Sequence, residues 1–217
     1  LKIGYFADGP WSHKTFEKLI KGKDIEILFI CGRNNSTDKI LKDYAKLNSI
    51  DFLTHKNVNS NQFINIIKKY SYDLLVSMSF NQIFKKKIIN SSKYKIINCH
   101  AGELPFYRGR NILNWVLIND EKKFGITVHY VDENIDSGDI ISQKVFKITD
   151  RDNYNTLLNK SYKECASILY DTICKFKKGQ VKARKQKSIH PYGSYCPKRK
   201  IGDEIINWNQ SSRDIFN

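Results

Sequence analysis

Two polar side chains end the apolar segment YKIINCH, residues 94–100, and a carboxylate lies in a later loop. The β-branched and aromatic residues of this segment predict a buried strand. Because side chains alternate along a strand, Asn98 and His100 are expected to share one face. There they could both donate hydrogen bonds to one oxygen, an oxyanion hole worth about 3 kcal/mol per donor in acyl transfer. Asp136 could orient the imidazole and accept a proton from an attacking amine.

Each of these residues has another interpretation when it is taken alone. His100 could be a buried turn histidine, and Asp136 stands in NIDSG, whose residues suit a tight turn. His100, Asp136 and His129 lack a metal-ligand spacing, so no metal site is expected. Cys99 points to the opposite face of the strand, which predicts a core position. No Ser or Cys stands in a nucleophile elbow, and this favours direct transfer to a bound amine.

Strands alternate with helices along most of the chain, which predicts a doubly wound, mostly parallel α/β sheet. We expect strands in KIGYFADG, which ends in turn residues, and in IEILFICG, DFLTH, DLLVSMS and YKIINCH, and then a pair in FGITVHYVDE and DIISQKVFKI. A long amphipathic helix is expected from Tyr154 to Lys178, with Gly179 as its C-terminal cap. Residues 1–180 would form one catalytic domain, and residues 181–217 a small appendage packed on it.

Four loops are expected to form one site, because ligands of open α/β sheets bind outside the carboxyl ends of the strands. They are DGPWSHK after the first strand, SFNQIF after the fourth, NCHAGELPFYRGRN after the fifth and NIDSGD before the last strand. Ser12 to Lys14 are expected to open a helix whose N-terminus favours anions.

The chain carries a formal charge of +15, from 37 Lys and Arg against 22 Asp and Glu among 217 residues. Lys far outnumbers Arg and no RNA-binding signature is present, so we interpret the excess as compositional rather than as nucleic-acid binding. Five scattered cysteines suggest neither disulfides nor a zinc site and fit a reducing cytoplasm. Neither a signal peptide nor an apolar run of membrane length is present, so we expect a cytoplasmic protein with no membrane partner.

Two segments resemble the signatures of the folate-dependent formyltransferases. NCHAGELPFYRG matches the family's Asn-x-His-x-x-x-Leu-Pro pattern, and GITVHYVDENIDSGDIISQ is similar to its second signature, with Asp136 placed 38 residues (136 minus 98) after Asn98. The resemblance implies that Asn98 and His100 polarise the formyl carbonyl of 10-formyltetrahydrofolate and that Asp136 helps to move the proton. It places the pterin between the SFNQIF loop and residues 131–139. The cofactor contacts that it implies are Met78, Phe80, Gln82, Ile83, Phe84, Asp132, Ile135, Gly138 and Asp139.

Within that family, several segments resemble the nucleotide-sugar N-formyltransferases. They are FYRGRN with NWVLIN, the aromatic and basic GPWSHK loop, and IINW near the end of the sequence. A nucleotide sugar needs a flat aromatic for its base and cations for its pyrophosphate. Trp11 could instead anchor the core, and Arg108 could hold its own loop. The substrate contacts that the resemblance implies are Gly9, Pro10, Trp11, Ser12, His13, Lys14, Tyr107, Arg108, Gly109, Arg110 and Asn111.

The implied acceptor is the amine of a dTDP-linked amino-dideoxy sugar, 4-amino-4,6-dideoxyglucose first and its 3-amino isomer next, for O-antigen or another bacterial surface glycan. Transfer RNA formyltransferases carry a C-terminal barrel that the 37 residues (217 minus 180) after Gln180 are not expected to supply. Glycinamide ribonucleotide formyltransferase of purine synthesis stays an alternative, although GPWSHK replaces the Gly-Ser-Asn loop of those enzymes. A basic nucleic-acid-binding module is the alternative from another class. We expect a homodimer, the common oligomer of such enzymes.

Overall fold

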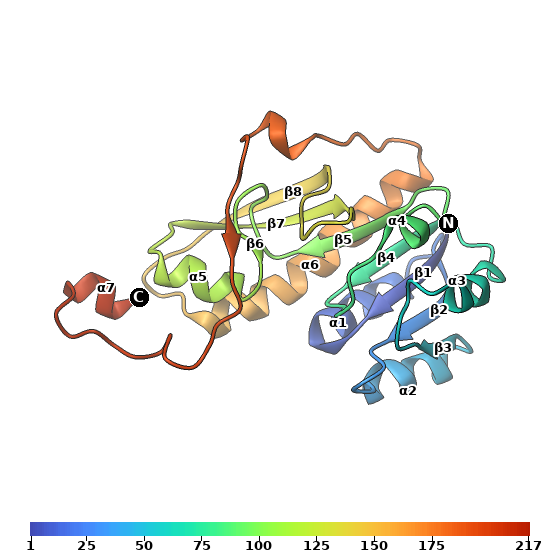
Figure 1. Cartoon of the computed structure of the whole chain (residues 1–217), viewed down its shortest axis with the longest axis horizontal. Helices are drawn as coiled ribbons and strands as arrows, with labels where there is room; N and C mark the ends of the chain where they lie inside the picture. Colours follow the sequence, from blue (N-terminus) through green and yellow to red (C-terminus); the bar gives the residue numbers. More distant parts are fainter.

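A seven-stranded sheet forms the centre of the structure, a computed structural model that describes residues 1–217 (Figure 1). The strand order is β3-β2-β1-β4-β5-β7-β8. The strands are β1 (Lys2–Ala7), β2 (Glu26–Gly32), β3 (Asp51–Thr54), β4 (Leu74–Met78), β5 (Ile96–His100), β7 (Lys123–Tyr130) and β8 (Ile140–Lys147). A separate pair joins β6 (Arg108–Gly109) in parallel to β9 (Tyr195–Cys196).

Strands β1 to β5 pair in parallel, whereas β7 is antiparallel to both β5 and β8. The predicted doubly wound, mostly parallel sheet is therefore confirmed. The chain moves outward from β1 to β2 and β3 and then returns to β4 on the other side of β1. This reversal of strand order opens a crevice at the carboxyl ends of β1 and β4, where open α/β sheets bind ligands.

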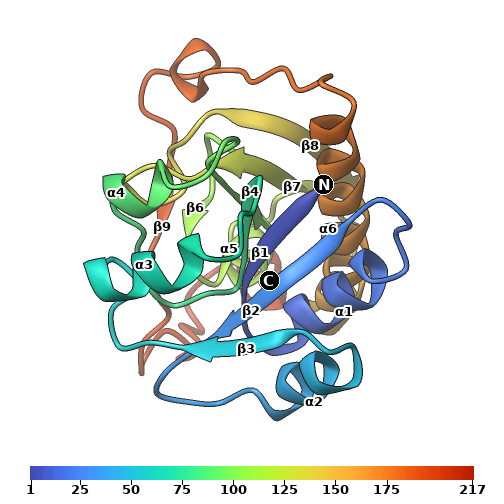
Figure 2. The same cartoon turned by 90° about the vertical axis from the view of Figure 1, so that its right-hand side faces the viewer.

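Helices cover both faces of the sheet (Figure 2). One apolar core contains residues of α1 (Gly9–Leu19), α2 (Lys39–Leu47), α5 (Ile112–Ile118) and α6 (Tyr154–Lys177). The second contains residues of α3 (Asn61–Lys68) and α4 (Lys86–Ile89). Tyr5 of β1 points into the first core and Phe6 into the second, as the alternation of side chains along a strand requires. None of the helices has the length and apolar character that a bilayer span requires.

Helix α6 matches the long helix that the sequence predicts. A capping box begins it, because Asn153 accepts a hydrogen bond from the Thr156 amide and Thr156 accepts one from the Asn153 amide. Its apolar stripe is buried against the sheet, with Leu169 and Ile173 fully inaccessible. Lys178 is its C-terminal cap, and Gly179 follows with a φ of +64°, a conformation that glycine adopts without strain.

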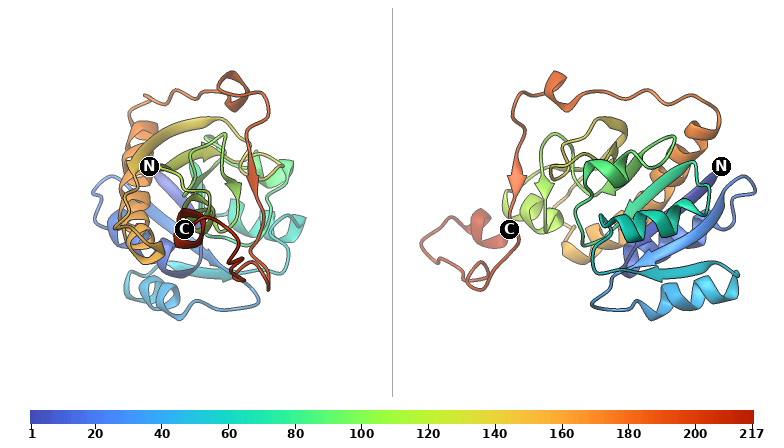
Figure 3. Two further views of the ribbon diagram at one scale, coloured as in Figure 1. Left: turned by 90° about the vertical axis from the view of Figure 1, so that its left-hand side faces the viewer. Right: turned by 45° about the vertical axis from the view of Figure 1, so that its right-hand side comes forward.

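The segment after α6 runs past the outer edge of the sheet and then down beside β6 and α5 (Figure 3). It contains a short 3₁₀ turn (Gln186–Ser188), β9 and α7 (Ser212–Phe216). Trp115 donates from Nε1 to the carbonyl of Pro197 at 2.9 Å. Near the end of the chain, Arg213 pairs with Asp120 and Asp150. These contacts hold the segment to the core, while the division of the chain after residue 180 stays a prediction.

Candidate active site

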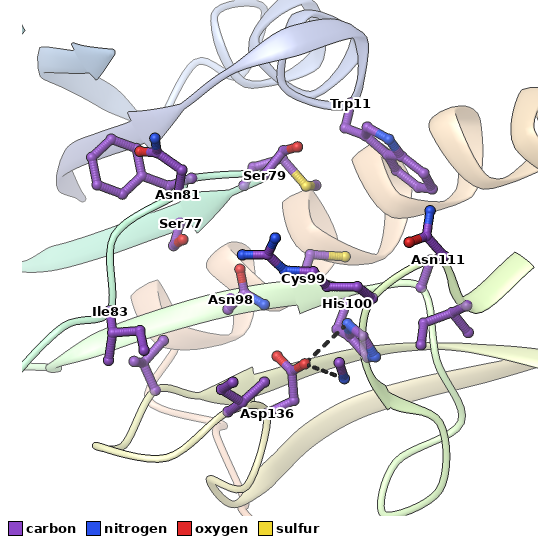
Figure 4. A pocket seen from close by; sticks show the side chains of 18 of the residues that line it. Trp11, Ser77, Ser79, Asn81, Ile83, Asn98, Cys99, His100, Asn111 and Asp136 are labelled. Atoms are coloured by element: carbon purple, nitrogen blue, oxygen red, sulfur yellow. Dashed lines mark hydrogen bonds and ion pairs between the residues drawn. The ribbon is translucent and has the colours of Figure 1, made fainter. Parts of the chain in front are cut away.

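Asn98 and His100 line a cavity of about 660 Å³ at the carboxyl end of β5 (Figure 4). The alternation of side chains puts both on the cavity side. Cys99, between them, directs its sulfur at the carbonyl oxygen of Cys165 in α6, 3.8 Å away. The residue is 6% exposed, so the core position predicted for Cys99 is confirmed. Asn98 and His100 therefore face the cavity from β5, while the other side chains of this strand are buried in the core.

A buried imidazole on the neighbouring strand holds the Asn98 amide. Asn98 and His129 are register partners on β5 and β7, and Asn98 Nδ2 lies 3.3 Å from His129 Nε2. The other ring nitrogen, Nδ1, donates to the carbonyl of Tyr130 at 2.7 Å, so Nε2 of the neutral ring is an acceptor. One N–H of the Asn98 amide is therefore committed to His129. The second N–H can donate to an oxygen bound in the cavity.

His100 is fixed by a backbone carbonyl on its far side. Its Nε2 lies 2.7 Å from the carbonyl oxygen of Tyr107, and that oxygen can only accept, so Nε2 carries the proton. Gly102 packs against this bond, and a side chain there would collide with Tyr107 and with the ring. The other nitrogen, Nδ1, lies 3.5 Å from Asp136 Oδ2. Nδ1 is therefore the atom of His100 that can gain or give a proton.

Asp136 stands between two imidazoles in the loop from β7 to β8. Its Oδ2 faces His100 and its Oδ1 lies 3.5 Å from His129 Nε2, while the Gly109 amide donates to Oδ2 at 2.9 Å. Burial alone raises the pKa of this carboxyl, but His100 and His129, whenever the ring nitrogen that faces it is protonated, and the Gly109 amide hold the pKa below its ordinary value of 3.8. The carboxylate is therefore ionised at neutral pH and can balance a positive charge on His100.

Most residues expected to contact the cofactor line the same cavity. They are Met78, Phe80, Gln82, Ile83, Phe84, Asp132 and Ile135. The rings of Phe80 and Phe84 stack with their centroids 5.7 Å apart. Ile83 and Ile135 leave 57% and 45% of their surfaces exposed. The Gln82 amide bonds to backbone groups of His55 and Val58, so it shapes the loop. This end of the cavity therefore has apolar walls, and the polar Ser79 and Asn81 lie beside them.

Gly138 and Asp139, the other two expected cofactor contacts, do not line the cavity. Gly138 packs so closely on Tyr130 that a Cβ would collide with the Tyr130 carbonyl. Asp139 accepts a hydrogen bond at its carbonyl from the Tyr130 amide at 2.9 Å. Both residues close the β7–β8 turn that carries Asp136.

Four of the expected substrate contacts line the cavity: Trp11, Gly109, Arg110 and Asn111. Figure 4 shows Trp11 and Asn111 at the end opposite Ile83, with Asn98 and His100 between the two ends. Trp11 packs edge-on against Tyr162 of α6, with centroids 4.9 Å apart, so it also joins the core. This end of the cavity carries an aromatic ring, and the cavity lining also includes the exposed Arg110.

The remaining expected substrate contacts do not line the cavity: Gly9, Pro10, Ser12, His13, Lys14, Tyr107 and Arg108. Ser12 is fully buried and donates its hydroxyl to the Gly9 carbonyl, and Lys14 pairs with Glu17. Burial, together with a hydrogen bond to Glu121, raises the pKa of Tyr107 to about 12. Arg108 binds Gln186 and the carbonyl of Tyr192. These side chains make contacts within the protein, and their contacts with a substrate stay a prediction.

The start of α1 is occupied by a carboxylate of the chain itself. The sequence predicts that this helix begins at Ser12 to Lys14, but it begins at Gly9. The reason is Pro10, which favours helix initiation in the first turn. Asp38 accepts from the Gly9 amide at 2.7 Å and lies 2.7 Å from His13 Nε2. Because free N–H groups at a helix N-terminus are what binds an anion there, Asp38 already uses the Gly9 amide and adds a negative charge beside this helix start.

Several residues of the site were not predicted from the sequence. Arg33 lines the cavity, lies 3.1 Å from Asp8 and donates to the carbonyl of Ser79. Tyr154, Tyr195 and Lys198 also line the cavity. The last two arrive through the pairing of β6 with β9, which no local pattern indicates. The sequence suggests His129 only as one member of a metal-ligand set that lacks a ligand spacing, and does not indicate its contact with Asn98. The structure contains no group of three or more His, Cys, Asp or Glu residues that could hold a metal ion.

Known proteins resemble this chain in sequence and in fold. Residues 12–173 match the sequence profile described as Formyl transferase. The methionyl-tRNA formyltransferase of Fusobacterium nucleatum is 33% identical over 224 residues, which cover 100% of this chain and 71% of that protein. WlaRD, a sugar 3N-formyl transferase solved in the presence of dTDP and 5-N-formyl-THF, superposes with a TM-score of 0.77 at 24% identity, covering 100% of this chain and 77% of that chain. The Helicobacter canadensis N-formyltransferase, in complex with folinic acid and dTDP-3-aminofucose, gives 0.75 at 23% identity, with 99% and 77% covered. These two likenesses show a shared fold.

Proposed function

We propose a function from the premise that this chain belongs to the formyltransferase family. In the proposal, the protein moves the formyl group of 10-formyltetrahydrofolate, the donor used by the family, to the amine of a dTDP-linked amino-dideoxy sugar. The observation that carries it is the layout of the cavity. Its polar centre of Asn98, His100 and Asp136 lies between an end with the apolar Ile83 and an end with the aromatic Trp11, and Arg110 and Lys198 are among the lining residues.

The apolar end of the cavity suits a folate. Phe80, Ile83 and Ile135 present apolar surface there, and a flat pterin can lie against such walls. Backbone groups of the loops at 79–84 and 131–136 are available to the polar edge of the ring. When bound, the folate supplies the formyl carbon, whose bond to the donor nitrogen is exchanged for a bond to the acceptor amine.

The centre of the cavity suits acyl transfer to an amine. The free N–H of Asn98 can donate to the formyl oxygen as negative charge develops on it. His100 Nδ1 can take the proton that the attacking amine loses, and the resulting imidazolium would face the ionised Asp136 at 3.5 Å. The low pKa of Asp136 makes this carboxylate a weak base. In this proposal Asp136 therefore stabilises the charged His100 rather than keeping the proton.

The other end of the cavity suits a nucleotide diphosphate. Arg110 and Lys198 are exposed cations of the cavity lining that can pair with the phosphates, and Trp11, Tyr154 and Tyr195 of the same lining offer aromatic faces to a base. The two solved relatives bound to dTDP and to dTDP-3-aminofucose support this assignment. Both the 4-amino and the 3-amino sugars fall within the proposal, and their formylated products would enter surface glycans.

The start of α1 argues against glycinamide ribonucleotide as the acceptor. That substrate ends in a phosphate monoester, a dianion that a helix N-terminus would bind well. Here the carboxylate of Asp38 already accepts from Gly9 and repels a second anion. A nucleotide diphosphate can bind instead through Arg110 and Lys198, away from this carboxylate.

A methionyl-transfer RNA is the second candidate acceptor. The Fusobacterium relative with this activity in its name is 33% identical. Residues 182–200 hold seven Lys and Arg and neither Asp nor Glu, and Lys198 of this segment reaches the cavity. Such a segment could follow a phosphate backbone. The cavity itself favours the smaller acceptor, because its lining offers both aromatic and cationic groups to a nucleotide diphosphate.

A panel of acceptors tests the proposal. Release of tetrahydrofolate from 10-formyltetrahydrofolate would be followed with the 4-amino and 3-amino dTDP-dideoxyhexoses, glycinamide ribonucleotide and methionyl-tRNA. We expect turnover with one dTDP sugar, and turnover with that sugar should depend on both Arg110 and Lys198. Turnover with methionyl-tRNA alone, falling steeply as salt rises, would replace the proposal with the second candidate. Turnover with glycinamide ribonucleotide alone would refute the interpretation of Asp38.

A further inference from the structure

The buried side chain of Gln186 joins the loop that carries Asp136 to the segment that carries Arg108 and Gly109. Gln186 is 2% exposed and opens the 3₁₀ turn in the segment after α6, beyond residues 12–173 of the family match. Its Nε2 donates to the carbonyls of Asp136 and Gly138, each at 2.8 Å. Its Oε1 accepts from Arg108 Nε at 3.0 Å and from Nη2 at 2.7 Å. All the polar atoms of this amide are therefore used in one place.

The partners themselves fix the orientation of the Gln186 amide. A guanidinium can only donate, so the oxygen of Gln186 must face Arg108. The two carbonyls can only accept, so the NH₂ group must face Asp136 and Gly138. No other side chain of this length offers one oxygen that accepts two hydrogen bonds and one NH₂ group that donates two. A carboxylate would satisfy Arg108 but would oppose both carbonyls.

These bonds close a ring around the Asp136 carboxylate. Gln186 binds the backbone of Asp136 on one side and Arg108 on the other, and the residue after Arg108, Gly109, donates its amide to Asp136 Oδ2 at 2.9 Å. Asp136 has a φ of +50°, a left-handed conformation that Asp tolerates better than most residues but that surrounding contacts still have to stabilise. The neighbouring residues Asn134 and Ile135 are exposed, so they supply little of that support.

We propose that Gln186 is a positioning residue of the reaction, which holds the Asp136 turn against Gly109 so that the carboxylate stays beside His100. The inference rests on the proposed formyl transfer for its kinetic consequence, but its geometric part stands apart from any substrate. Gln186 does not touch the cavity, and its effect passes through Asp136 and Gly109. The segment after α6 thus completes the catalytic centre from outside the family-matched residues.

Two variants of Gln186 separate positioning from simple anchoring of the chain. Gln186→Met keeps the length and removes all four hydrogen bonds, whereas Gln186→Glu keeps the bond to Arg108 and removes both donors. We expect each variant to lower kcat by about 10- to 100-fold, since displacement of a catalytic group by about 1 Å costs about that much. The KM values and the affinity for a 5-formyl folate should stay within about twofold. In both variants the amide hydrogen of Gly109 should exchange at least about tenfold faster.

Gln143→Met is the matched control. The Gln143 amide also binds a loop carbonyl and a side chain, Leu104 O at 2.8 Å and Thr127 Oγ1 at 2.9 Å, but it lies outside the ring around Asp136. This control should lose thermal stability without changing exchange at Gly109. If Gln186→Met does not fold, Gln186→Asn carries the same expectations, because its amide is one methylene too short to reach both loops.

The outcomes separate the inference from the proposed function. If Gln186→Glu keeps the wild-type kcat and the slow exchange of Gly109, the residue only anchors Arg108 and the inference is wrong. Unchanged exchange at Gly109 in a folded Gln186→Met variant would also refute it. If the wild-type protein turns over no acceptor, the proposed function fails, and exchange at Gly109 still decides whether Gln186 holds the turn.

Discussion

Replacing Asp136 with Asn removes one negative charge and keeps the shape of the side chain. In the wild-type protein, Asp136 Oδ2 lies 3.5 Å from His100 Nδ1, and the two side chains are only 14% and 9% exposed. If His100 becomes positively charged during the reaction, loss of this pair costs about 5 kcal/mol at the effective dielectric of about 20 that suits such sites. That free energy corresponds to a fall in kcat of about 10³- to 10⁴-fold.

The assay measures kcat by tetrahydrofolate release and, separately, the dissociation constant of a 5-formyl folate. We expect Asp136→Asn to keep folate affinity within about threefold, because the carboxylate stabilises a charge present only during reaction. Glu133→Gln is the control, since Glu133 lies on the same loop but outside the cavity lining and should leave kcat unchanged. A fall in kcat of less than about tenfold would refute the electrostatic role of Asp136. Equal losses in kcat and folate affinity would make it a binding residue instead.

Four further outcomes follow from the structure. Folding lowers the pKa of Asp136, so the ionised carboxylate stabilises the folded protein fully above the unfolded pKa of about 3.8. This stabilisation is lost as the pH falls toward the lower pKa of the folded state. The difference in unfolding free energy between wild type and Asp136→Asn should therefore shrink from pH 6 to pH 3, which urea titrations can measure. Gly138→Ala should lower the free energy of unfolding by about 3 kcal/mol, because its Cβ would collide with a backbone carbonyl; an unchanged denaturation midpoint would contradict this close packing. Asp38→Ala should cost about 2 kcal/mol and Asp38→Asn less, since only the alanine removes every acceptor both from the Gly9 amide of α1 and from the Leu41 amide of α2, and thermal unfolding compares the two. Arg110→Met and Lys198→Met should each raise the KM for the nucleotide sugar about tenfold and leave folate affinity unchanged, a pattern that equilibrium binding and initial rates can verify.

The sequence predicts the centre of the candidate site because that centre depends on local rules. Asn98 and His100 share a face through the alternation of β5, and Asp136 stands in a turn whose residues tolerate a left-handed backbone. The parallel sheet follows from strands alternating with helices, and the single long helix α6 follows from its apolar stripe and caps.

Contacts between distant segments were beyond sequence reasoning. Asp38 meets Gly9 across 29 residues, and Gln186 meets Arg108 across 78. Such pairings depend on how elements pack, which neither periodicity nor turn chemistry encodes. The basic GPWSHK loop was therefore interpreted as a substrate contact. Only Trp11 of that loop lines the cavity, while Ser12 and His13 bind neighbouring parts of the chain.

The fate of a labelled formyl carbon tests the central claim most directly. The protein would be mixed with [¹³C]formyl-10-formyltetrahydrofolate and an excess of each dTDP-amino sugar, and the carbon spectrum recorded over a single turnover. The account predicts that the label moves into a formamide on one of these sugars, and that Asp136→Asn slows this transfer about 10³-fold or more. Appearance of the label as free formate, or an unchanged donor signal beside both sugars, would contradict it.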